Sequence, residues 1–423
     1  MFTNPQRASF QRVGRNALII IFVTLLILEL FTRLVWWNDQ VVRSLFGREI
    51  TLLPAPLVNE RQIESLKTWA ADPNKYVQFD PVLGWSIRPN AQGQQDGVTY
   101  TSNSTGMRSL REYPLSKAAG ILRIGTFGPS FTHSDDVADE ATWQAQMERA
   151  RPDLEVMNWG VGGYGTDQAF LRYQTQGAAY QPDVVLIGFE EDNIRRNVNR
   201  FRPFFRGQTD IPLTKPVFIE KGNELTLLEN PFQTLEALED TLLNSPQRFL
   251  DIVCPHDFYC QRDRYQSQPL DIFASYRFGR TLVYEMTQAG RPGVSSFQNP
   301  IIQRVNFLLI RQFAEEAIRN GSVPIVLIFP ERSSIEAHER GEATPYAAGI
   351  TLLREQGLQV IDLTPAFAHA RQTDQRNYLD YYAYDGGHFS QLGNYVVSQT
   401  VLAHLCQQKI LENCGDFLKQ APP

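Results

Sequence analysis

A serine and a histidine stand in loops where both could take part in nucleophilic catalysis. Ser130 lies in the run Gly-Pro-Ser-Phe-Thr, directly after the apolar segment 121–127. A serine that follows a strand and lies close to a glycine can project its hydroxyl group and offer its own backbone N–H to a developing oxyanion. Asp385 precedes His388 by three residues, so its carboxylate can orient one ring nitrogen and leave the other as a general base. Together these residues point to acyl transfer through a serine, although each run alone also occurs in structural turns.

Two further segments offer hydrogen-bond donors for such an oxyanion. The run 160–165 contains four glycines in six positions, which can expose backbone N–H groups and admit a ligand closely. Dinucleotide binding is the alternative, but the spacing does not follow Gly-x-Gly-x-x-Gly cleanly and no acidic ribose partner follows. The acidic run 190–192 precedes Asn193, whose neutral side-chain amide is a candidate donor. No matching histidines accompany the acidic run, so we expect no metal there.

The order of these segments resembles the sequence blocks of the SGNH, or GDSL-like, hydrolases. The resemblance covers roughly residues 121–405 and is carried by GPSFTH (128–133), NWGVGGYGTDQ (158–168), GFEEDN (188–193) and DGGHFSQLGN (385–394). Ahead of these blocks, FDPVLGWSIRPN (79–90) and NSTGMR (103–108) are similar to the lead-in of membrane-anchored members.

The resemblance implies an esterase that needs no metal or organic cofactor. In that family the first block supplies the nucleophile, which is Ser130 here, and the last block supplies Asp385 and His388 of the triad. The resemblance also implies an oxyanion hole formed by the N–H groups of Ser130 and Gly163 and by the side chain of Asn193.

Two departures from the family pattern bear on activity. Pro129 stands where the family has the aspartate of Gly-Asp-Ser, and Asp192-Asn193 stands where it has Asn-Asp. Either Asn193 fills the asparagine position through a one-residue shift, or Asp192 occupies it. A carboxylate there would repel an oxyanion and favour an inactive or altered enzyme. The glycine of the hole could also be Gly160 in place of Gly163.

Three functions follow from these features. The first is an esterase or O-deacylase that acts on surface carbohydrate or lipid. The second is an O-acyltransferase that works with a membrane-protein partner, and the third is an inactive SGNH domain that binds glycans or another partner. Arg196 and Arg200 belong to a basic stretch that could contact an anionic sugar or phosphate headgroup, or form a solvated face.

The elements that must position these loops alternate as in α/β proteins. Short apolar segments, which we predict to be strands, lie at 121–127, 154–159, 184–189, 323–329 and 358–363. Such segments separated by helical stretches indicate a parallel sheet covered on both faces, with functional loops at the carboxyl ends of its strands. We therefore predict an α/β domain over 121–415, with the three-layer, flavodoxin-like architecture that the SGNH resemblance implies.

Other segments are assigned around this domain. The stretch 197–300 is too long for a plain loop, and we predict an inserted subdomain or lid. Residues 38–120 are predicted to form a stalk followed by a strand-and-turn extension, and residues 416–423 a short tail.

The N-terminus has the composition of a membrane-spanning helix. Residues 17–28 carry no charge and the apolar character resumes over 30–37, which together gives roughly the 20 residues that a crossing helix needs. Glu29 and Arg33 lie four residues apart and can pair on one helix face. Trp36 and Trp37, at the end of the predicted span 16–37, fit an aromatic belt at the membrane surface.

The charges ahead of the span predict its orientation. Arg7, Arg12 and Arg15 precede it without an acidic residue, which favours a cytoplasmic tail over 1–15 and an extracytoplasmic domain. A cleaved signal peptide is the alternative, but no small-x-small cleavage site follows the apolar run.

Composition and cysteine spacing agree with that compartment. The 423 residues carry a net charge of −6, so no chain-wide basic surface indicates nucleic-acid binding. The four cysteines are even in number and lack metal-like spacing, which favours disulfides over free thiols. We expect Cys254–Cys260 and Cys406–Cys414 because both pairs close local loops, with two other pairings open.

Overall fold

The computed structural model of the chain describes residues 5–35, 43–45, 48–72, 74–95, 97–289 and 296–415. Two predictions fall outside these residues: the aromatic belt at Trp36 and Trp37, and the tail at 416–423.

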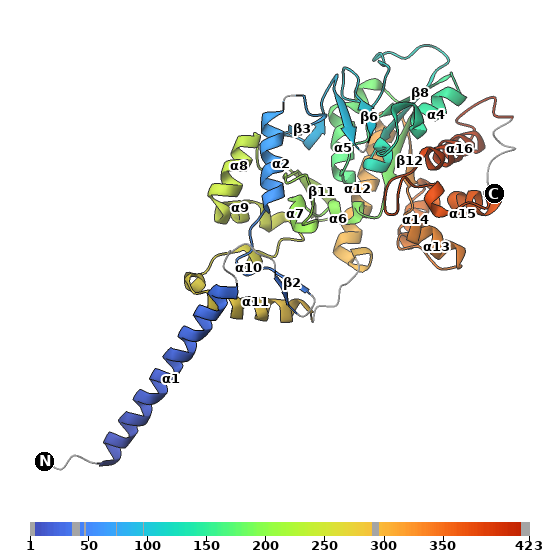
Figure 1. Cartoon of the computed structure of the whole chain (residues 1–423). Helices are drawn as coiled ribbons and strands as arrows, with labels where there is room; N and C mark the ends of the chain where they lie inside the picture. The colour runs from blue at the N-terminus through green and yellow to red at the C-terminus, as the bar shows by residue number, and fades with distance from the viewer. Residues whose placement is uncertain are drawn as a thin grey trace.

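A five-stranded parallel sheet forms the centre of the molecule (Figure 1). Its strands are β7 (Leu122–Phe127), β8 (Leu154–Asn158), β9 (Val184–Phe189), β12 (Val323–Ile328) and β13 (Gln359–Asp362), arranged in the order β13-β12-β9-β7-β8. Every residue of β8 and β9 is buried, as expected for strands covered on both faces. The chain leaves β8 at one edge and returns on the other side of β7. Ligands bind in doubly wound sheets at this switch point, outside the carboxyl ends of the strands.

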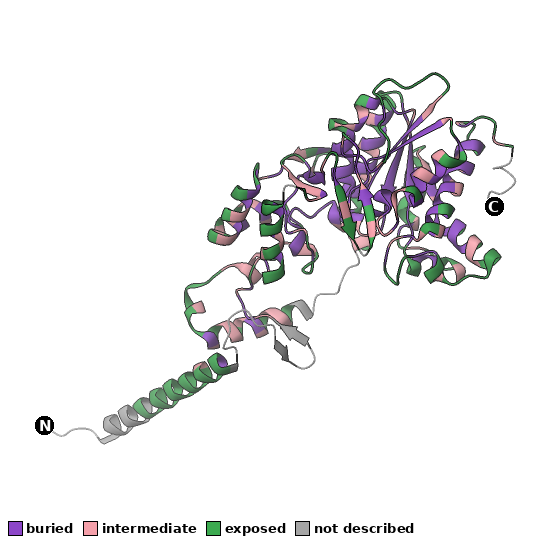
Figure 2. Ribbon diagram, turned by 45° about the horizontal axis from the view of Figure 1, so that its top comes forward, coloured by how far each residue is buried: buried purple, intermediate pink, exposed green. Residues whose placement is uncertain are grey.

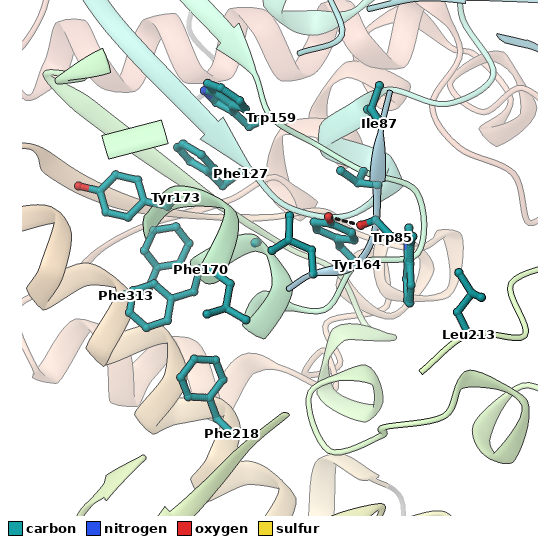
Figure 3. Close-up of a cluster of buried hydrophobic side chains, with 14 of the residues drawn as sticks. Trp85, Ile87, Phe127, Trp159, Tyr164, Phe170, Tyr173, Leu213, Phe218 and Phe313 are labelled. Carbon is teal, nitrogen blue, oxygen red and sulfur yellow. Dashed lines mark hydrogen bonds between the residues drawn. The ribbon is translucent and has the colours of Figure 1, made fainter. Parts of the chain in front are cut away.

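Helices cover both faces of the sheet and make it the middle of three layers. One face carries α5 (Thr166–Thr175), α12 (Pro300–Arg319) and α14 (Ala347–Glu355), and the other carries α4 (Trp143–Ala150), α15 (Thr364–Asp374) and α16 (Gln391–Gln407). On the first face the ring of Phe313 lies 6.0 Å from Phe127 and 5.0 Å from Phe170 (Figure 3). On the second face Trp143 and Val397 pack against Ile124 of β7. The predicted α/β class is confirmed.

Short elements complete the loops at the carboxyl end of the sheet. They are α3 (Ser130–His133), α6 (Asn193–Arg196) and α13 (Arg332–Glu339), and each follows one of the central strands β7, β9 and β12. The candidate catalytic serine therefore begins the helix that follows β7, the strand between β9 and the edge strand β8.

The segment before β7 packs on the domain and contacts the glycine-rich loop. It comprises α2 (Glu60–Ala71) and two hairpins, β3 (Val77–Asp80) with β4 (Gly84–Ile87) and β5 (Gln92–Gln95) with β6 (Val98–Thr101). The Tyr164 hydroxyl donates to the Trp85 carbonyl at 2.6 Å, and the indole N–H of Trp85 donates to the Gly162 carbonyl at 3.0 Å (Figure 3). Because α2 buries Leu66 and Trp69, part of the predicted stalk belongs to the folded domain.

The long segment between β9 and β12 contributes its buried apolar residues to the hydrophobic core on the first face of the sheet. Its elements are α7 (Arg202–Phe205), the hairpin β10 (Val217–Lys221) and β11 (Glu224–Leu228), α8 (Leu235–Asn244), α9 (Pro246–Val253), α10 (Arg262–Tyr265) and α11 (Ala274–Ala289). Within this segment the ring centroid of Phe249 lies 4.8 Å from Phe201 and 5.8 Å from Phe232.

Both predicted disulfides are confirmed. Cys254–Cys260 closes a loop after α9, and Cys406–Cys414 ties the end of α16 to the chain that follows it. All four cysteines of the sequence are therefore paired.

The first helix, α1 (Pro5–Val35), projects away from the rest of the molecule (Figure 1), and its described side chains are mostly exposed (Figure 2). Among the described residues, one helical segment is long and apolar enough to cross a membrane, and it is Arg15–Leu34 of α1. The predicted pair is confirmed, because Arg33 Nε donates to Glu29 Oε1 at 2.7 Å. A short hairpin of β1 (Arg43–Leu45) and β2 (Arg48–Ile50) follows this helix.

Candidate active site

The turn from β7 into α3 fixes the position of Ser130. Gly128 is needed there, because a Cβ atom on it would lie 2.2 Å from the Thr132 hydroxyl. Pro129 caps α3, with φ at −78°, and its carbonyl accepts hydrogen bonds from the N–H groups of Thr132 and His133, both at 2.9 Å. Proline suits this position because its ring fixes φ near this value. The departure from Gly-Asp-Ser thus leaves the serine just after the carboxyl end of β7.

Ser130 forms one end of a chain of three hydrogen-bonded side chains. Its Oγ lies 2.7 Å from His388 Nε2, and His388 Nδ1 lies 2.8 Å from Asp136 Oδ2. The same carboxylate oxygen accepts the backbone N–H of His388 at 3.1 Å. With its proton on Nδ1, the imidazole donates to Asp136 and accepts from the Ser130 hydroxyl. This tautomer can remove a proton from the serine.

Asp385 does not take part in this chain, which corrects the sequence expectation. Its side chain is 72% exposed, and Oδ1 accepts from Arg332 Nη1 at 3.1 Å. The reason lies in the local turn: the Ala383 N–H donates to the His388 carbonyl at 2.8 Å, which leaves Asp385 at the tip of the loop. His388 points back into the site while Asp385 points outward.

Asp136 is the residue that sequence reasoning missed. It follows Ser130 by six residues in the same loop and has a φ of +70°, a left-handed conformation that aspartate tolerates better than most residues. Its backbone N–H donates to the Tyr100 hydroxyl at 3.2 Å, which holds the residue in this conformation. The available signal was the pair of adjacent acids, Asp135 and Asp136, directly after the predicted nucleophile.

The neighbouring Asp135 binds a different histidine. His133 Nδ1 contacts Asp135 Oδ1, and His133 Nε2 lies 3.0 Å from the Tyr76 hydroxyl. Burial lowers the pKa of His133, although the contact with Asp135 opposes this, and in its neutral form the ring can donate to Asp135 and accept from Tyr76. Although burial opposes it, the contact with His133 and the nearby charges of His388 and Arg108 lower the pKa of Asp135 to about 2.

The electrostatics of His388 favour its protonated form. Burial of the ring opposes protonation, but the hydrogen bond to Asp136 and the negative charges of Asp135 and Asp136 outweigh it and raise the pKa of His388. An imidazole held in this way is a stronger base than an ordinary histidine, and its protonated form is stabilised after it accepts the serine proton.

Three backbone N–H groups are free to receive an oxyanion. Within the described ranges, the N–H groups of Ser130, Gly162 and Gly163 have no hydrogen-bond acceptor, and all three residues line the same pocket. Gly163 has a φ of +79°, which glycine adopts without strain. Gly160 is excluded as the donor, since its N–H donates to Asn158 Oδ1 at 3.0 Å. A Cβ on Gly160 would also lie 2.2 Å from the backbone nitrogen of His133.

The side chain of Asn193 is not available to the oxyanion, contrary to the sequence expectation. Asn193 is fully buried; its Oδ1 accepts from the Glu190 N–H at 2.9 Å, and its Nδ2 donates to the Tyr164 carbonyl at 3.3 Å. The amide therefore joins the loop after β9 to the glycine-rich loop.

Asp192 does line the pocket, but arginines compensate its charge. Its carboxylate contacts Arg195, Arg196 and Arg206. Although burial works in the opposite direction, the charges of Arg196 and Arg195 lower the pKa of Asp192. The repulsion of an oxyanion by an isolated carboxylate is therefore reduced at this position.

The two predicted substrate-binding arginines differ in position. Arg196 lines the pocket and pairs with Glu190 at 2.5 Å and with Asp192 at 3.4 Å. Arg200 lies outside the pocket lining and donates to the backbone carbonyls of Ile252 and Glu229, so it stabilises the insertion. This corrects the expectation that Arg200 contacts substrate.

The site opens into a pocket of about 1130 Å³. Aromatic and charged side chains share its lining, and they include Trp69, Tyr76, Lys75, Tyr100, Glu190, Arg202, Glu331, Tyr382 and Tyr384. Burial and the negative charges of Glu191 and Glu190 raise the pKa of Glu331 to about 7. In the part of the chain that the structure describes, no group of three His, Cys, Asp or Glu side chains is placed to hold a metal.

Comparisons with known proteins add the following. No family model matches the sequence, and no curated protein matches it significantly. Similar solved structures include a member of the lipolytic protein G-D-S-L family from Veillonella parvula DSM 2008, 12% identical over 65% of this chain and 93% of that chain, with a TM-score of 0.32. The acetylxylan esterase Axe2 from Geobacillus stearothermophilus is 12% identical over 67% of this chain and 93% of that chain, with a TM-score of 0.35.

A third similar structure is LAE5, an alpha/beta hydrolase enzyme from the metagenome of Lake Arreo, Spain. It is 12% identical over 71% of this chain and 99% of that chain, with a TM-score of 0.35. TM-scores this low support no conclusion about function, which has to rest on the site geometry. The chain's own sheet order, β13-β12-β9-β7-β8, gives it the flavodoxin-like α/β architecture that its sequence predicts.

Proposed function

We propose that this chain is a membrane-anchored serine hydrolase that acts on ester groups. Ser130 is the nucleophile, His388 is the general base, and Asp136 orients His388. The observation that carries the proposal is the continuous set of contacts from Asp136 through His388 to Ser130, at 2.8 and 2.7 Å. It lies at the switch point of the sheet, where doubly wound proteins bind their ligands.

The proposed reaction proceeds through an acyl-serine. His388 Nε2 accepts the proton of the Ser130 hydroxyl as Oγ attacks the ester carbonyl, and the developing oxyanion is held by the N–H groups of Ser130, Gly162 and Gly163. Collapse of the tetrahedral intermediate breaks the bond to the alcohol, which takes the proton from His388. Water, activated by the same histidine, then attacks the acyl-serine and releases the carboxylic acid.

The pocket supports an acylated carbohydrate as the substrate. Charged groups such as Lys75 and the Glu190–Arg196 pair line it, and a long alkyl chain placed beside them would remove them from water without compensation. Sugar hydroxyls, by contrast, can hydrogen-bond to such groups. The Tyr384 ring, which lines the pocket and is 51% exposed, offers an aromatic surface for the face of a sugar ring. We therefore favour short acyl groups on a sugar over long-chain lipid esters.

The location of the reaction rests on α1 and the disulfides. The apolar segment Arg15–Leu34 is long enough to anchor the chain, and both disulfides are of the kind that persists outside the cytoplasm. Together with the arginines that precede the span, they support a cytoplasmic N-terminus and a catalytic domain on the other side of the membrane.

A fluorophosphonate probe tests the nucleophile directly. The full chain in detergent micelles is treated with the probe beside the variants Ser130→Ala and His388→Ala, and the modified residue is located by peptide mass. We expect labelling of the wild type at Ser130 and loss of labelling in both variants. A folded wild-type chain that does not react would contradict the proposal and favour a glycan-binding domain.

Substrate preference is tested next on the same preparation. Release of acid from an acetylated oligosaccharide is compared with release from a long-chain glycerol ester, with Ser130→Ala as the blank. A preference for the long-chain ester would refute the carbohydrate assignment while leaving the nucleophile intact.

A further inference from the structure

The helix α11 has two opposite faces with different surroundings. On one face Ala274, Arg277 and Thr281 pack against the chain that follows α1. The Leu53 N–H donates to the Thr281 hydroxyl at 3.0 Å, and Arg277 Nε donates to the Leu53 carbonyl at 2.8 Å. This face is accounted for within the molecule.

The opposite face is apolar and uncovered. Tyr276, Val283 and Met286 recur at the spacing of one helix face, on the side away from Thr281, and Val283 and Met286 are 63% and 75% exposed. The turn that leads into α11 adds more exposed apolar side chains. The full set, which we call the α11 face, is Leu270, Ile272, Phe273, Tyr276, Val283 and Met286. Exposed apolar side chains gathered on one side of a helix are typical of an interaction site.

The start of α11 is attached to α1 near the end of its apolar segment. The Glu29 carboxylate accepts the backbone N–H groups of Ala274 at 3.0 Å and Ser275 at 2.8 Å, and the Ser275 hydroxyl at 2.7 Å. Arg33 Nη2 donates to the Ile272 carbonyl at 2.9 Å. These bonds account for both charges in the part of α1 that follows Arg15, because they hold α11 across the end of α1 (Figure 1).

The point of attachment sets the depth of α11 relative to a membrane. Glu29 precedes Leu34, the end of the apolar segment, by five residues, which corresponds to about 7–8 Å of helix rise. Amphipathic helices that lie in a membrane surface bury their apolar faces by about 5–10 Å. A helix attached at Glu29 is therefore at the right height to enter the interface when α1 spans the bilayer.

We propose that the α11 face lies in the outer interfacial layer of the bilayer, as a second membrane contact beside α1. The occupant of this face is lipid, because the face is continuous with the apolar surface of α1 and is level with the end of its span. The inference rests on α1 as the anchor and is independent of the catalytic assignment. Two attachments would restrict how the domain tilts on the membrane, which a single helix does not.

Depth-dependent quenching tests this contact on the full chain. Because all four native cysteines are in disulfides, single cysteines can be labelled with an environment-sensitive fluorophore at Val283→Cys and Met286→Cys. The chain is reconstituted in vesicles of a monounsaturated phosphatidylcholine, part of which carries bromine near the glycerol end of an acyl chain in one preparation and near its terminal methyl group in a second. Leu352→Cys, an exposed leucine on α14, is the matched water-facing control, and Leu26→Cys in α1 is the membrane control.

We expect loss of most of the fluorescence, with a blue-shifted emission, at Val283 and Met286, and several-fold weaker quenching at Leu352. Quenching at Leu26 together with control-level signals at Val283 and Met286 would overturn the proposal and favour a protein partner for this face. Absence of quenching at Leu26 would overturn both the anchor and the second contact. None of these outcomes depends on esterase activity. Failure of the membrane contact can therefore be distinguished from failure of the proposed catalytic function.

Discussion

Two adjacent aspartates in one loop each bind a histidine, and only one of the two pairs can act as a base. Asp136 contacts His388, whose second nitrogen faces Ser130 and the pocket. Asp135 contacts His133, whose second nitrogen is closed by the Tyr76 hydroxyl. The pKa of His388 is raised, although burial opposes this, whereas burial lowers the pKa of His133. The comparison shows that the group at Nε2 decides the role of a His–Asp pair.

The buried pair belongs to the scaffold that holds the acid loop. Arg108, from the extension before the α/β domain, donates to the carbonyls of His133, Ser134 and Val137 and pairs with Asp139 at 3.0 Å. Its side chain is fully buried. The loop therefore receives support from the N-terminal extension on one side and presents Asp136 to His388 on the other.

The largest effect should come from the acid that sequence reasoning missed. We expect Asp136→Asn to lower kcat/KM for an ester by about 10⁴-fold, because the amide no longer holds the reactive tautomer of His388 or stabilises its protonated form. The matched change Asp385→Asn, at an exposed carboxylate paired with Arg332, should alter kcat/KM by less than about threefold. Initial rates on a chromogenic ester measure both. A large loss in Asp385→Asn with an active Asp136→Asn would restore the original triad.

The next effect is on stability. Arg108→Leu removes one partner of a buried ion pair, leaves Asp139 without its counter-ion, and deprives the Ser134 and Val137 carbonyls of their donor. We expect the free energy of unfolding to fall by about 3–5 kcal/mol. Thermal or denaturant unfolding in detergent measures this, with the exposed Arg340→Leu as the control for loss of a surface pair. Equal stability of the two variants would show that the extension does not hold the loop.

Some parts of the fold and of the candidate site could be predicted from the sequence, and others could not. The five strands were predictable because their buried residues form short, almost wholly apolar runs, as in the VVLIGF of β9. Ser130 and His388 were predictable because each has its characteristic neighbours in sequence. The acid was not, because the choice between Asp385 and Asp136 depends on the turn at 383–388, which directs one carboxylate into solvent.

The role of Asn193 was hidden for a similar reason. Its side-chain amide could donate to an oxyanion or hydrogen-bond to neighbouring backbone. In the structure it bonds to the Glu190 N–H and the Tyr164 carbonyl, so it joins two loops. In the same way, the sequence alone could not show that Arg196 lines the pocket and Arg200 does not. The path of the backbone after α6 decides which of the two side chains reaches the pocket.

The pH dependence sharpens the contrast between the two histidines. Catalysis requires neutral His388, so kcat/KM should rise with pH through the raised pKa of this residue, above the value of about 6.5 for an ordinary histidine. Removing the charge of Asp136 removes one cause of the shift, so the residual activity of Asp136→Asn should rise at lower pH than that of the wild type. An unchanged profile in this variant would indicate that another group titrates.

The raised pKa of His388 also affects the free energy of unfolding, whose dependence on pH is opposite to that of kcat/KM. Because the folded pKa of His388 is raised above its unfolded value, its contribution is fully present below the unfolded pKa and is lost as pH rises through the folded pKa. His133 behaves in the reverse sense, since its lowered pKa destabilises the folded state when the pH falls below the ordinary histidine range.

The smallest effect should separate the two pairs most directly. Tyr76→Phe removes the hydroxyl that donates to His133 Nε2 and keeps the ring, so the free energy of unfolding should fall by about 1 kcal/mol. Because His133 has no role in proton transfer, kcat/KM per folded molecule should change by less than about threefold, and its pH profile should stay in place. Tyr395→Phe, an exposed tyrosine on α16, should change neither quantity. A shifted pH profile in Tyr76→Phe would mean that the His133–Asp135 pair is electrostatically coupled to the His388–Asp136 pair through the adjacent aspartates. The two histidines would then titrate as a single unit.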